Sequence, residues 1–378
     1  MINLPEKFEK WIIYQIGLEG IYEIGERGFK KKIEELRETL FQLSHLFTHK
    51  RTCVKEEFDE RFDKAYLTFF SPLSYLKTCC VLREAFSFLP LRSNMRVLDI
   101  GAGQGAGSLA GFEILKEMGK RPEEIVCIDR RIPSYNILEG LNLPHDYKIM
   151  DVEDFGIRRM KNFDLVLIIN SLTEAFGFDV DFLWKKLALI FDQILSENGI
   201  LVIIEPALKD STRCLMKIRD IFFKERPDGS IIAPCILINE CPMLKVKSRN
   251  EWCHFSIKWK PPRFMEIINR ELKREIDLPK FSYLIILKGK FSFPENYVGA
   301  GRVVSNLRIE KGKKRFFLCK NEKYICFERL DRDASEKNAM VDEILKGDIV
   351  KVDEKSCEVK GGNLRIKKDT SVEILKKL

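Results

Sequence analysis

The chain has 378 residues, 45% hydrophobic and 32% charged, which is enough for about two to three globular domains of ordinary composition. Its net charge of +8 is too mild to indicate a nucleic-acid-binding protein by itself, although it permits a polyanionic partner. No apolar run approaches the length of a membrane span, and the first residues lack the features of a targeting peptide. We therefore expect a cytoplasmic, monomeric protein with no membrane partner.

Residues 1–88 have helical periodicity. Ile33, Leu36, Leu40 and Leu43 recur at spacings of three and four, which predicts an amphipathic helix. We expect this region to be a helical cap packed on the domain that follows. A less favoured alternative is an RNA-contacting face that carries the basic run 30–32.

A glycine-rich loop follows a short buried strand in the segment RVLDIGAGQGAGS, residues 96–108. Asp99 lies near the end of the strand, and Gly101, Gly103 and Gly105 let the backbone turn tightly and approach a ligand closely. Such a loop is typical of nucleotide-like ligands, but glycine spacing alone is a weak signal and also matches a dinucleotide site.

Three carboxylates in sequence order favour S-adenosylmethionine over NAD. Asp99 is placed to face the aminocarboxypropyl end of the cofactor, and Asp129 follows a second strand, where it could accept both ribose hydroxyls. Asp151 follows a strand over 147–150, where the adenine amino group is usually bound. The order and spacing resemble class I methyltransferases; the alternative is an ordinary strand-to-helix turn with surface acids.

Strands and helices alternate from residue 89 to 290, as a doubly wound α/β sheet requires. A buried strand over 163–169 ends at Asn170 and Ser171, which we expect to line the cofactor or the substrate. A helix over 181–195 leads to a strand over 200–204. For Glu205, at the end of that strand, packing and functional roles are equally favoured.

An insertion over 231–260 brings three cysteines, Cys235, Cys241 and Cys253, into one loop region, two of them beside prolines. Three soft ligands on an irregular loop predict a metal site that lacks one ligand, with zinc or an iron–sulfur cluster as the candidates. His254 adjoins Cys253, and adjacent residues rarely both reach one metal ion. The alternative is three buried thiols.

The last segment, 291–378, alternates short strands with turns and one helix over 336–345, which predicts a small OB-like β-barrel of the kind that often binds RNA. Its net charge is +5. The basic cluster Lys311, Lys313, Lys314 and Arg315 is a candidate phosphate-contacting loop, although a solvated turn explains it nearly as well.

The runs APC, CP and WCHF and the segment 280–284, KFSYL, resemble a family of methyltransferase-like proteins associated with the small ribosomal subunit, over residues 75–350. The resemblance implies a [4Fe–4S] cluster on Cys235, Cys241, Cys253 and a fourth cysteine from the C-terminal region. Cys319 matches that fourth position best, with Cys326 as the competing choice. Bound S-adenosylmethionine and the small subunit with its rRNA as partner are also implied.

The resulting prediction has three parts: a helical region (1–88), a class I methyltransferase domain with Rossmann-like sheet and cysteine insertion (89–290), and a small OB-like β-barrel (291–378). Asn170 begins Asn-Ser-Leu-Thr where base-methylating enzymes carry Asn-Pro-Pro-Tyr, and no catalytic base is evident. The chain is therefore expected to be an rRNA methyltransferase, or alternatively an assembly factor that keeps the fold as a scaffold. A methyltransferase for a small molecule or a protein is a weaker alternative.

Overall fold

A computed structural model of the protein describes residues 3–47, 59–151, 160–236, 239–246, 251–270, 272 and 274–378. The chain forms two compact units. Unit 1 comprises residues 1–205 and 257–279, and unit 2 comprises residues 206–256 and 280–378. The division into three parts expected from the sequence partitions the chain differently and stays a prediction. None of the described helices is long and apolar enough to cross a membrane.

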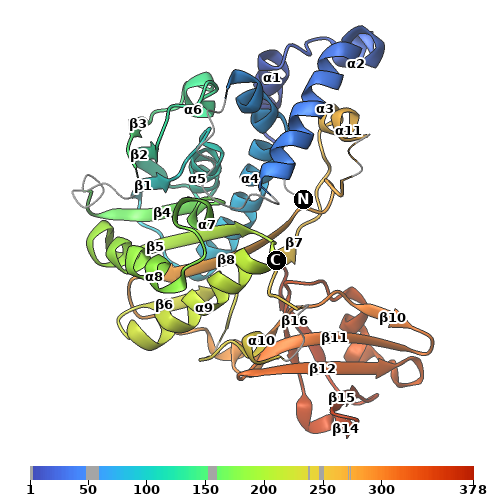
Figure 1. The fold of residues 1–378 in the computed structure, drawn as a ribbon. Coiled ribbons are helices and arrows are strands. Elements are labelled where there is room, and N and C mark those ends of the chain that lie inside the picture. Colours follow the sequence, from blue (N-terminus) through green and yellow to red (C-terminus); the bar gives the residue numbers. More distant parts are fainter. Residues whose placement is uncertain are drawn as a thin grey trace. The chain divides into compact units, whose positions relative to one another are not determined.

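Unit 1 begins with helices, in agreement with the helical periodicity of the sequence (Figure 1). The helices are α1 (Glu6–Gln15), α2 (Ile21–Ile24), η1 (Glu26–Phe29), α3 (Lys30–His45) and α4 (Glu60–Phe88). The buried side chains of α3 are Ile33, Leu36, Leu40 and Leu43, so the predicted apolar stripe is confirmed. Asp59 caps α4 by accepting hydrogen bonds from the amides of residues 61 and 62.

A parallel sheet with strand order β3-β2-β1-β4-β5 forms the centre of unit 1. Its strands are β1 (Asn94–Ile100), β2 (Arg121–Asp129), β3 (Asp146–Ile149), β4 (Phe163–Ile169) and β5 (Leu195–Pro206), whose last residue belongs to unit 2. Every residue of β4 is buried, as expected for a strand covered on both faces. The order reverses at β1, so the carboxyl ends of β1, β2 and β4 form a switch point, where ligands bind in open α/β sheets. The Rossmann-like methyltransferase-type sheet is therefore confirmed.

The remaining helices of unit 1 connect these strands. They are α5 (Ala106–Glu117), α6 (Ile137–Gly140), α7 (Leu172–Phe176) and α8 (Val180–Leu189). A further helix of unit 1, α11 (Arg263–Asn269), comes later in the chain and lies against α3. The helix expected over 181–195 is split, because α8 gives way to a π-helical turn, η4 (Ile190–Ile194), and β5 begins at Leu195. The pattern of apolar residues is nearly the same for an α-helix and a π-helical turn, so periodicity could not separate them.

Unit 2 starts with the long helix α9 (Lys209–Glu225) and continues through the cysteine-bearing region. The elements of this region are β6 (Ser230–Ala233), α10 (Pro242–Lys245) and β7 (Phe255–Ser256), and both β6 and β7 pair antiparallel with β8 (Lys280–Leu287). Residues 237–238 and 247–250 of the predicted insertion lie outside the described residues.

The C-terminal part of unit 2 is an eight-stranded sheet with the order β14-β15-β12-β11-β9-β13-β16, in which β10 also pairs with β11. The strands are β9 (Ala300–Val303), β10 (Arg308–Glu310), β11 (Lys313–Lys320), β12 (Lys323–Leu330), β13 (Ile349–Val352), β14 (Glu358–Lys360), β15 (Asn363–Ile366) and β16 (Val372–Lys376). Within residues 274–378, all of which the structure describes, no pairing joins β14 to β16, so the closed OB-like barrel is not confirmed. The helix expected over 336–345 is a 3₁₀ helix, η7 (Glu336–Glu343).

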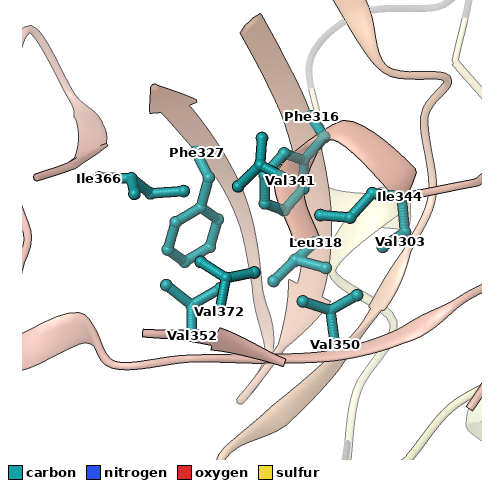
Figure 2. Packing of buried hydrophobic residues seen from close by; sticks show 10 residues of the cluster. All are labelled: Val303, Phe316, Leu318, Phe327, Val341, Ile344, Val350, Val352, Ile366 and Val372. Carbon is teal, nitrogen blue, oxygen red and sulfur yellow. The ribbon is translucent and has the colours of Figure 1, made fainter. Parts of the chain in front are cut away.

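Strand alternation divides β11 between two environments. Phe316 and Leu318 point into an apolar core together with Phe327 of β12, and the rings of the two phenylalanines stack at 5.6 Å between centroids (Figure 2). Phe317 and Cys319 point to the opposite face and belong to a second, smaller cluster. The same strand therefore completes the core of the sheet and delivers a thiol to its other side.

Candidate functional site

The glycine loop lies between β1 and α5, where the sequence predicts it. Gly101, Gly103 and Gly105 all have positive φ angles, of 70°, 53° and 86°. This backbone region is unfavourable for residues with a Cβ atom, so glycine is required at each turn. The Gly103 amide donates a 2.8 Å hydrogen bond to Asp129 Oδ2, and its carbonyl accepts a 2.8 Å bond from the Tyr147 hydroxyl.

A cleft of about 420 Å³ opens at this loop, within unit 1. Of the seven residues predicted to bind the cofactor, five line it: Gly101, Gly103, Asp129, Asp151 and Asn170. They follow β1, β2, β3 and β4, so the parallel sheet brings them together from sequence positions up to 69 residues apart. Asp99 and Gly105 are not among the lining residues.

Asp99 lies behind the loop, where its side chain is only 1% exposed. Its Oδ2 accepts a 2.7 Å hydrogen bond from the Ser108 hydroxyl at the start of α5. Burial raises the pKa of Asp99 to about 7, against the opposing effect of the Ser108 bonds. In this position Asp99 fastens the loop to α5, and its predicted contact with the cofactor's aminocarboxypropyl group stays a prediction.

Asn170 occupies the end of β4 in a left-handed conformation, with φ of 57°. Its Nδ2 donates a 3.1 Å hydrogen bond to the Ser74 hydroxyl of α4, while its buried Oδ1 has no hydrogen-bond partner among the described residues. The neighbouring Ser171 hydroxyl donates a 2.9 Å bond to the carbonyl of Ile100. The amide oxygen is therefore an available acceptor at the cleft.

Helix α4 supplies cleft residues that the sequence did not indicate. Asp63, only 2% exposed, pairs with Arg131 through two hydrogen bonds and accepts a third, of 2.8 Å, from the amide of Ser134. Tyr66 lies in the same wall. Burial raises its pKa above the ordinary range, and Glu174 and Asp129 add to the effect. Helix α4 is buried on most of its sides, and its sequence carries no signal that one of them meets a ligand cleft.

Glu205, for which packing and function were equally favoured, is completely buried and is not a lining residue of the cleft. Its Oε1 accepts a 3.0 Å hydrogen bond from the Leu172 amide, and its other oxygen bonds the Thr173 hydroxyl. Burial raises its pKa to about 7. These contacts hold the start of α7 in place, as a packing role requires.

A Gly101→Ala substitution should destabilise the protein more than Gly103→Ala. A Cβ atom at residue 101 would lie 2.5 Å from the Cβ of Ser171, whereas one at residue 103 would meet no described atom within 4 Å. Positive φ costs each variant about 1–2 kcal/mol, and overpacking adds about 1–3 kcal/mol at residue 101 alone. Urea unfolding measures both free energies. Equal losses would show that Ser171 moves aside without cost.

The four predicted metal ligands form a second candidate site, in unit 2. Cys241 and Cys319 belong to one buried cluster, and Cys235 and Cys253 pack against it; we call these four residues the four-cysteine site. Burial raises the pKa of Cys319 well above its usual value, and repulsion from the other three thiols raises it further. The four thiols thus pack in one cluster, although they come from separate segments of the chain.

The competing cysteine, Cys326, lies in a different environment. Its pKa is raised by burial, and the neighbouring charges that affect it are those of arginine, lysine and glutamate side chains rather than of the other thiols. Among the residues that the structure describes, no three His, Cys, Asp or Glu side chains are arranged closely enough to hold a metal ion. The four-cysteine site is accordingly a cluster of four neighbouring thiols that does not form a preorganised site for a single metal ion.

The candidate phosphate-contacting loop of unit 2 is largely paired with acids. Lys313 bonds Glu310 and Glu328, Lys314 bonds Asp342, and Arg315 bonds Glu310. These ion pairs satisfy much of the positive charge that made the segment a phosphate-binding candidate. Lys313, Lys314 and Arg315 lie in strand β11 and are half-buried, so the solvated-turn interpretation does not describe them, and phosphate contact by this segment stays a prediction.

Comparisons with solved structures give matches of low sequence identity. The plantazolicin methyltransferase BpumL in complex with SAH is 14% identical, with 69% of this chain and 99% of that chain covered and a TM-score of 0.38. A putative class I S-adenosylmethionine-dependent methyltransferase from Listeria monocytogenes is 13% identical, covers 77% and 91%, and has a TM-score of 0.38. A chain of a fibrillarin complex is 16% identical, covers 58% and 83%, and has a TM-score of 0.32. No curated protein matches.

The family comparison is more extensive. The family described as mitochondrial small ribosomal subunit Rsm22 matches residues 61–333. This range contains the glycine loop, all the cleft residues that follow the strands, and the four cysteines. Since the match spans well over half of the chain, the protein belongs to the Rsm22 family.

Proposed function

We propose that this protein binds S-adenosylmethionine and acts as a methyltransferase-like factor on the small ribosomal subunit or its rRNA during assembly. The observation that carries the proposal is the cleft in which a glycine loop, Asp129, Asp151 and Asn170 meet at the switch point of the sheet. The family description, which names the small ribosomal subunit, supports the choice of partner. Methyl transfer to rRNA is the finer part of the proposal.

In this proposal the residues of the cleft bind and orient the cofactor, and none of them takes part in the methyl transfer as an acid, base or nucleophile. Asp129 accepts hydrogen bonds from the ribose hydroxyls, Asp151 binds the adenine amino group, and the glycine loop lets the backbone approach the rest of the molecule. The acids of the cleft, Glu174 among them, favour a cationic sulfonium. Alignment of the acceptor with the methyl group then supplies most of the catalysis, and we assign no general base.

A second candidate function is that of an rRNA-binding assembly factor that uses the methyltransferase fold as a scaffold. The observation that favours it is the sequence Asn-Ser-Leu-Thr after β4, in place of the Asn-Pro-Pro-Tyr of base-methylating enzymes. Both candidates share the same cleft and the same partner, so they differ only in turnover.

We further propose that the four-cysteine site holds a [4Fe–4S] cluster, with zinc as the alternative. The donor types fit, because Cys235, Cys241, Cys253 and Cys319 provide four soft thiol ligands that pack in one buried cluster, although they are not arranged around a single metal ion in this structure. When bound, the cluster would tie the loop that carries the first three ligands to β11. Metal binding would then contribute to the stability of unit 2, since ligands from distant segments must stay together.

The family description names the mitochondrial small subunit, which supports a mitochondrial location in place of the cytoplasmic one expected from the sequence. The monomeric state stays a prediction.

Calorimetry with S-adenosylmethionine and methylation mapping of small-subunit rRNA test the proposal together. Binding of the cofactor, with loss of one rRNA methyl group in a deletion strain, would support the enzyme. Binding without any change in rRNA methylation, but with a defect in subunit assembly, would support the scaffold. Absence of cofactor binding by the full chain would overturn the role that we assign to the cleft.

A further inference from the structure

Helix α9 presents two polar side chains to the space that the thiols enclose. Thr212 and Arg219 both line a small pocket together with Cys235, Cys241 and Cys253, and all of these residues belong to unit 2. The two residues are seven positions apart, which is close to two helical turns, so they lie on the same face of α9. Neither residue was singled out by the sequence.

Thr212 is buried in a way that requires an explanation. The residue is 0% exposed, and its hydroxyl has no hydrogen-bond partner among the residues described. A threonine within a helix can satisfy its hydroxyl on the carbonyl four residues earlier, as Thr78 does with Ser74 at 2.8 Å. Thr212 makes no such bond, although its backbone amide donates to the carbonyl of Leu208 at 2.9 Å. A buried unsatisfied hydroxyl is destabilising unless a ligand completes its hydrogen bond.

Buried positive charge surrounds the same thiols. Arg219 is 3% exposed and donates 2.6 and 2.8 Å hydrogen bonds to Asp220 and to the carbonyl of Asn239. Burial would lower the pKa of Arg219, but Cys235, Asp220 and Cys241 together raise it.

Arg302 is 1% exposed and donates hydrogen bonds to the carbonyls of Pro234 and Gly347. The positive charges of Lys346 and Arg302 lower the pKa of the Cys253 thiol, against the larger raising effect of burial. Buried cations are stable only next to compensating negative charge. Asp220 provides part of it for Arg219, and a negatively charged cluster bound to the thiols would add to it.

We propose that Thr212 donates its hydroxyl hydrogen to a sulfur atom of the cluster held by the four-cysteine site, while Arg219 and Arg302 compensate the cluster's negative charge. This inference rests on the proposed cluster. Hydrogen bonds to the sulfur atoms of an iron–sulfur cluster, and positive charges next to them, raise its reduction potential, because they stabilise the more negative reduced form. Thr212 is therefore a positioning residue that tunes the cluster and binds no metal itself.

The test compares Thr212→Val with the wild type, Thr212→Ser and the control Thr78→Val, all as full-length protein purified anaerobically. Valine keeps the shape of threonine but removes the donor, serine keeps the donor, and Thr78 is an equally buried threonine that does not line the pocket. Iron and acid-labile sulfide are measured first. The midpoint potential is then measured by dithionite titration, followed by visible absorption and electron paramagnetic resonance.

We expect Thr212→Val to retain iron and to lose roughly tenfold in the one-electron reduction equilibrium, the typical effect of one hydrogen bond to a charged group. A tenfold change corresponds to a midpoint about 59 mV more negative. Thr212→Ser and Thr78→Val should titrate like the wild type. If Thr212→Val loses iron instead, recovery of iron in Thr212→Ser would support the hydrogen bond, and equal loss in both would overturn it.

A full complement of iron with an unchanged midpoint in Thr212→Val would overturn this inference and leave the cluster in place. A wild-type protein that carries stoichiometric zinc, or no metal, would overturn the proposed cluster and this inference with it. Cofactor binding at the cleft of unit 1 is measured separately by calorimetry, so neither result touches that part of the proposed function.

Discussion

A Cys319→Ser variant purified without oxygen should lose most of its iron, whereas a Cys326→Ser variant should keep it. The two residues form a matched pair, because both are buried, at 6% and 7% exposure, and they lie on adjacent strands of one hairpin. Of the two, Cys319 belongs to the buried cluster in which the other three cysteines pack, and Cys326 does not. A serine hydroxyl is a poor ligand for iron in this setting, so the fourth bond to the cluster would be lost.

Iron and sulfide per chain, together with the visible absorption of the protein, measure this effect. Circular dichroism of both variants controls for misfolding, since each substitution places a hydroxyl where a buried thiol was. Equal iron content in the two variants, or loss in Cys326→Ser alone, would contradict the assignment of Cys319. Loss of iron in both, with native circular dichroism, would mean that the hairpin as a whole positions the cluster.

The choice between these two cysteines shows what a strand pattern can and cannot predict. In the hairpin, Cys319 is opposite Tyr324 and Phe317 is opposite Cys326, so both cysteines project from the same face. Alternation therefore predicts that each could reach a site on that face, but not which one does. The choice of Cys319 depends instead on the loop residues Cys235 and Cys253, which pack against the cluster that contains Cys319 and not Cys326.

For the cofactor cleft, the sequence predicts which residues lie at the edge of the sheet but not how every side chain is oriented. A glycine loop after one buried strand, and polar residues at the ends of three further strands, were sufficient to predict five of the lining residues, because parallel strands end at one edge of a sheet. The orientation of Asp99 could not be predicted in this way. Its carboxylate lies within a strand rather than after it, and the bond to Ser108 draws it behind the loop.

Contacts between segments far apart in the sequence could not be predicted from motifs or from hydrophobic periodicity. The pair formed by Asp63 and Arg131 joins positions 68 residues apart, and Thr212 meets the cysteines through the packing of α9. None of Asp63, Arg131 and Thr212 belongs to a motif, and nothing in the sequence around them indicates a ligand. Side chains of this kind become functional candidates only through burial and hydrogen-bond accounting in three dimensions.

An Asp129→Ala variant should bind S-adenosylmethionine at least about 100-fold more weakly than the wild type. Two hydrogen bonds from ribose hydroxyls to a carboxylate contribute about 1.5–3 kcal/mol each, and the variant loses both. Isothermal calorimetry measures the affinity, and the melting temperature reports whether the fold persists. Asp146→Ala is the matched control, because that carboxylate lies on the neighbouring strand β3, pairs with Lys148 at 2.9 Å and does not line the cleft.

Asp129 also accepts the Gly103 amide, so the alanine variant alters the loop as well as the ribose contact. Asp129→Asn separates the two effects, since the asparagine oxygen can still accept from Gly103 while the negative charge is gone. A large loss in both variants would assign the effect to the charge that binds the ribose. A loss in alanine alone would assign it to the loop. Wild-type affinity in both, at an unchanged melting temperature, would refute the ribose contact.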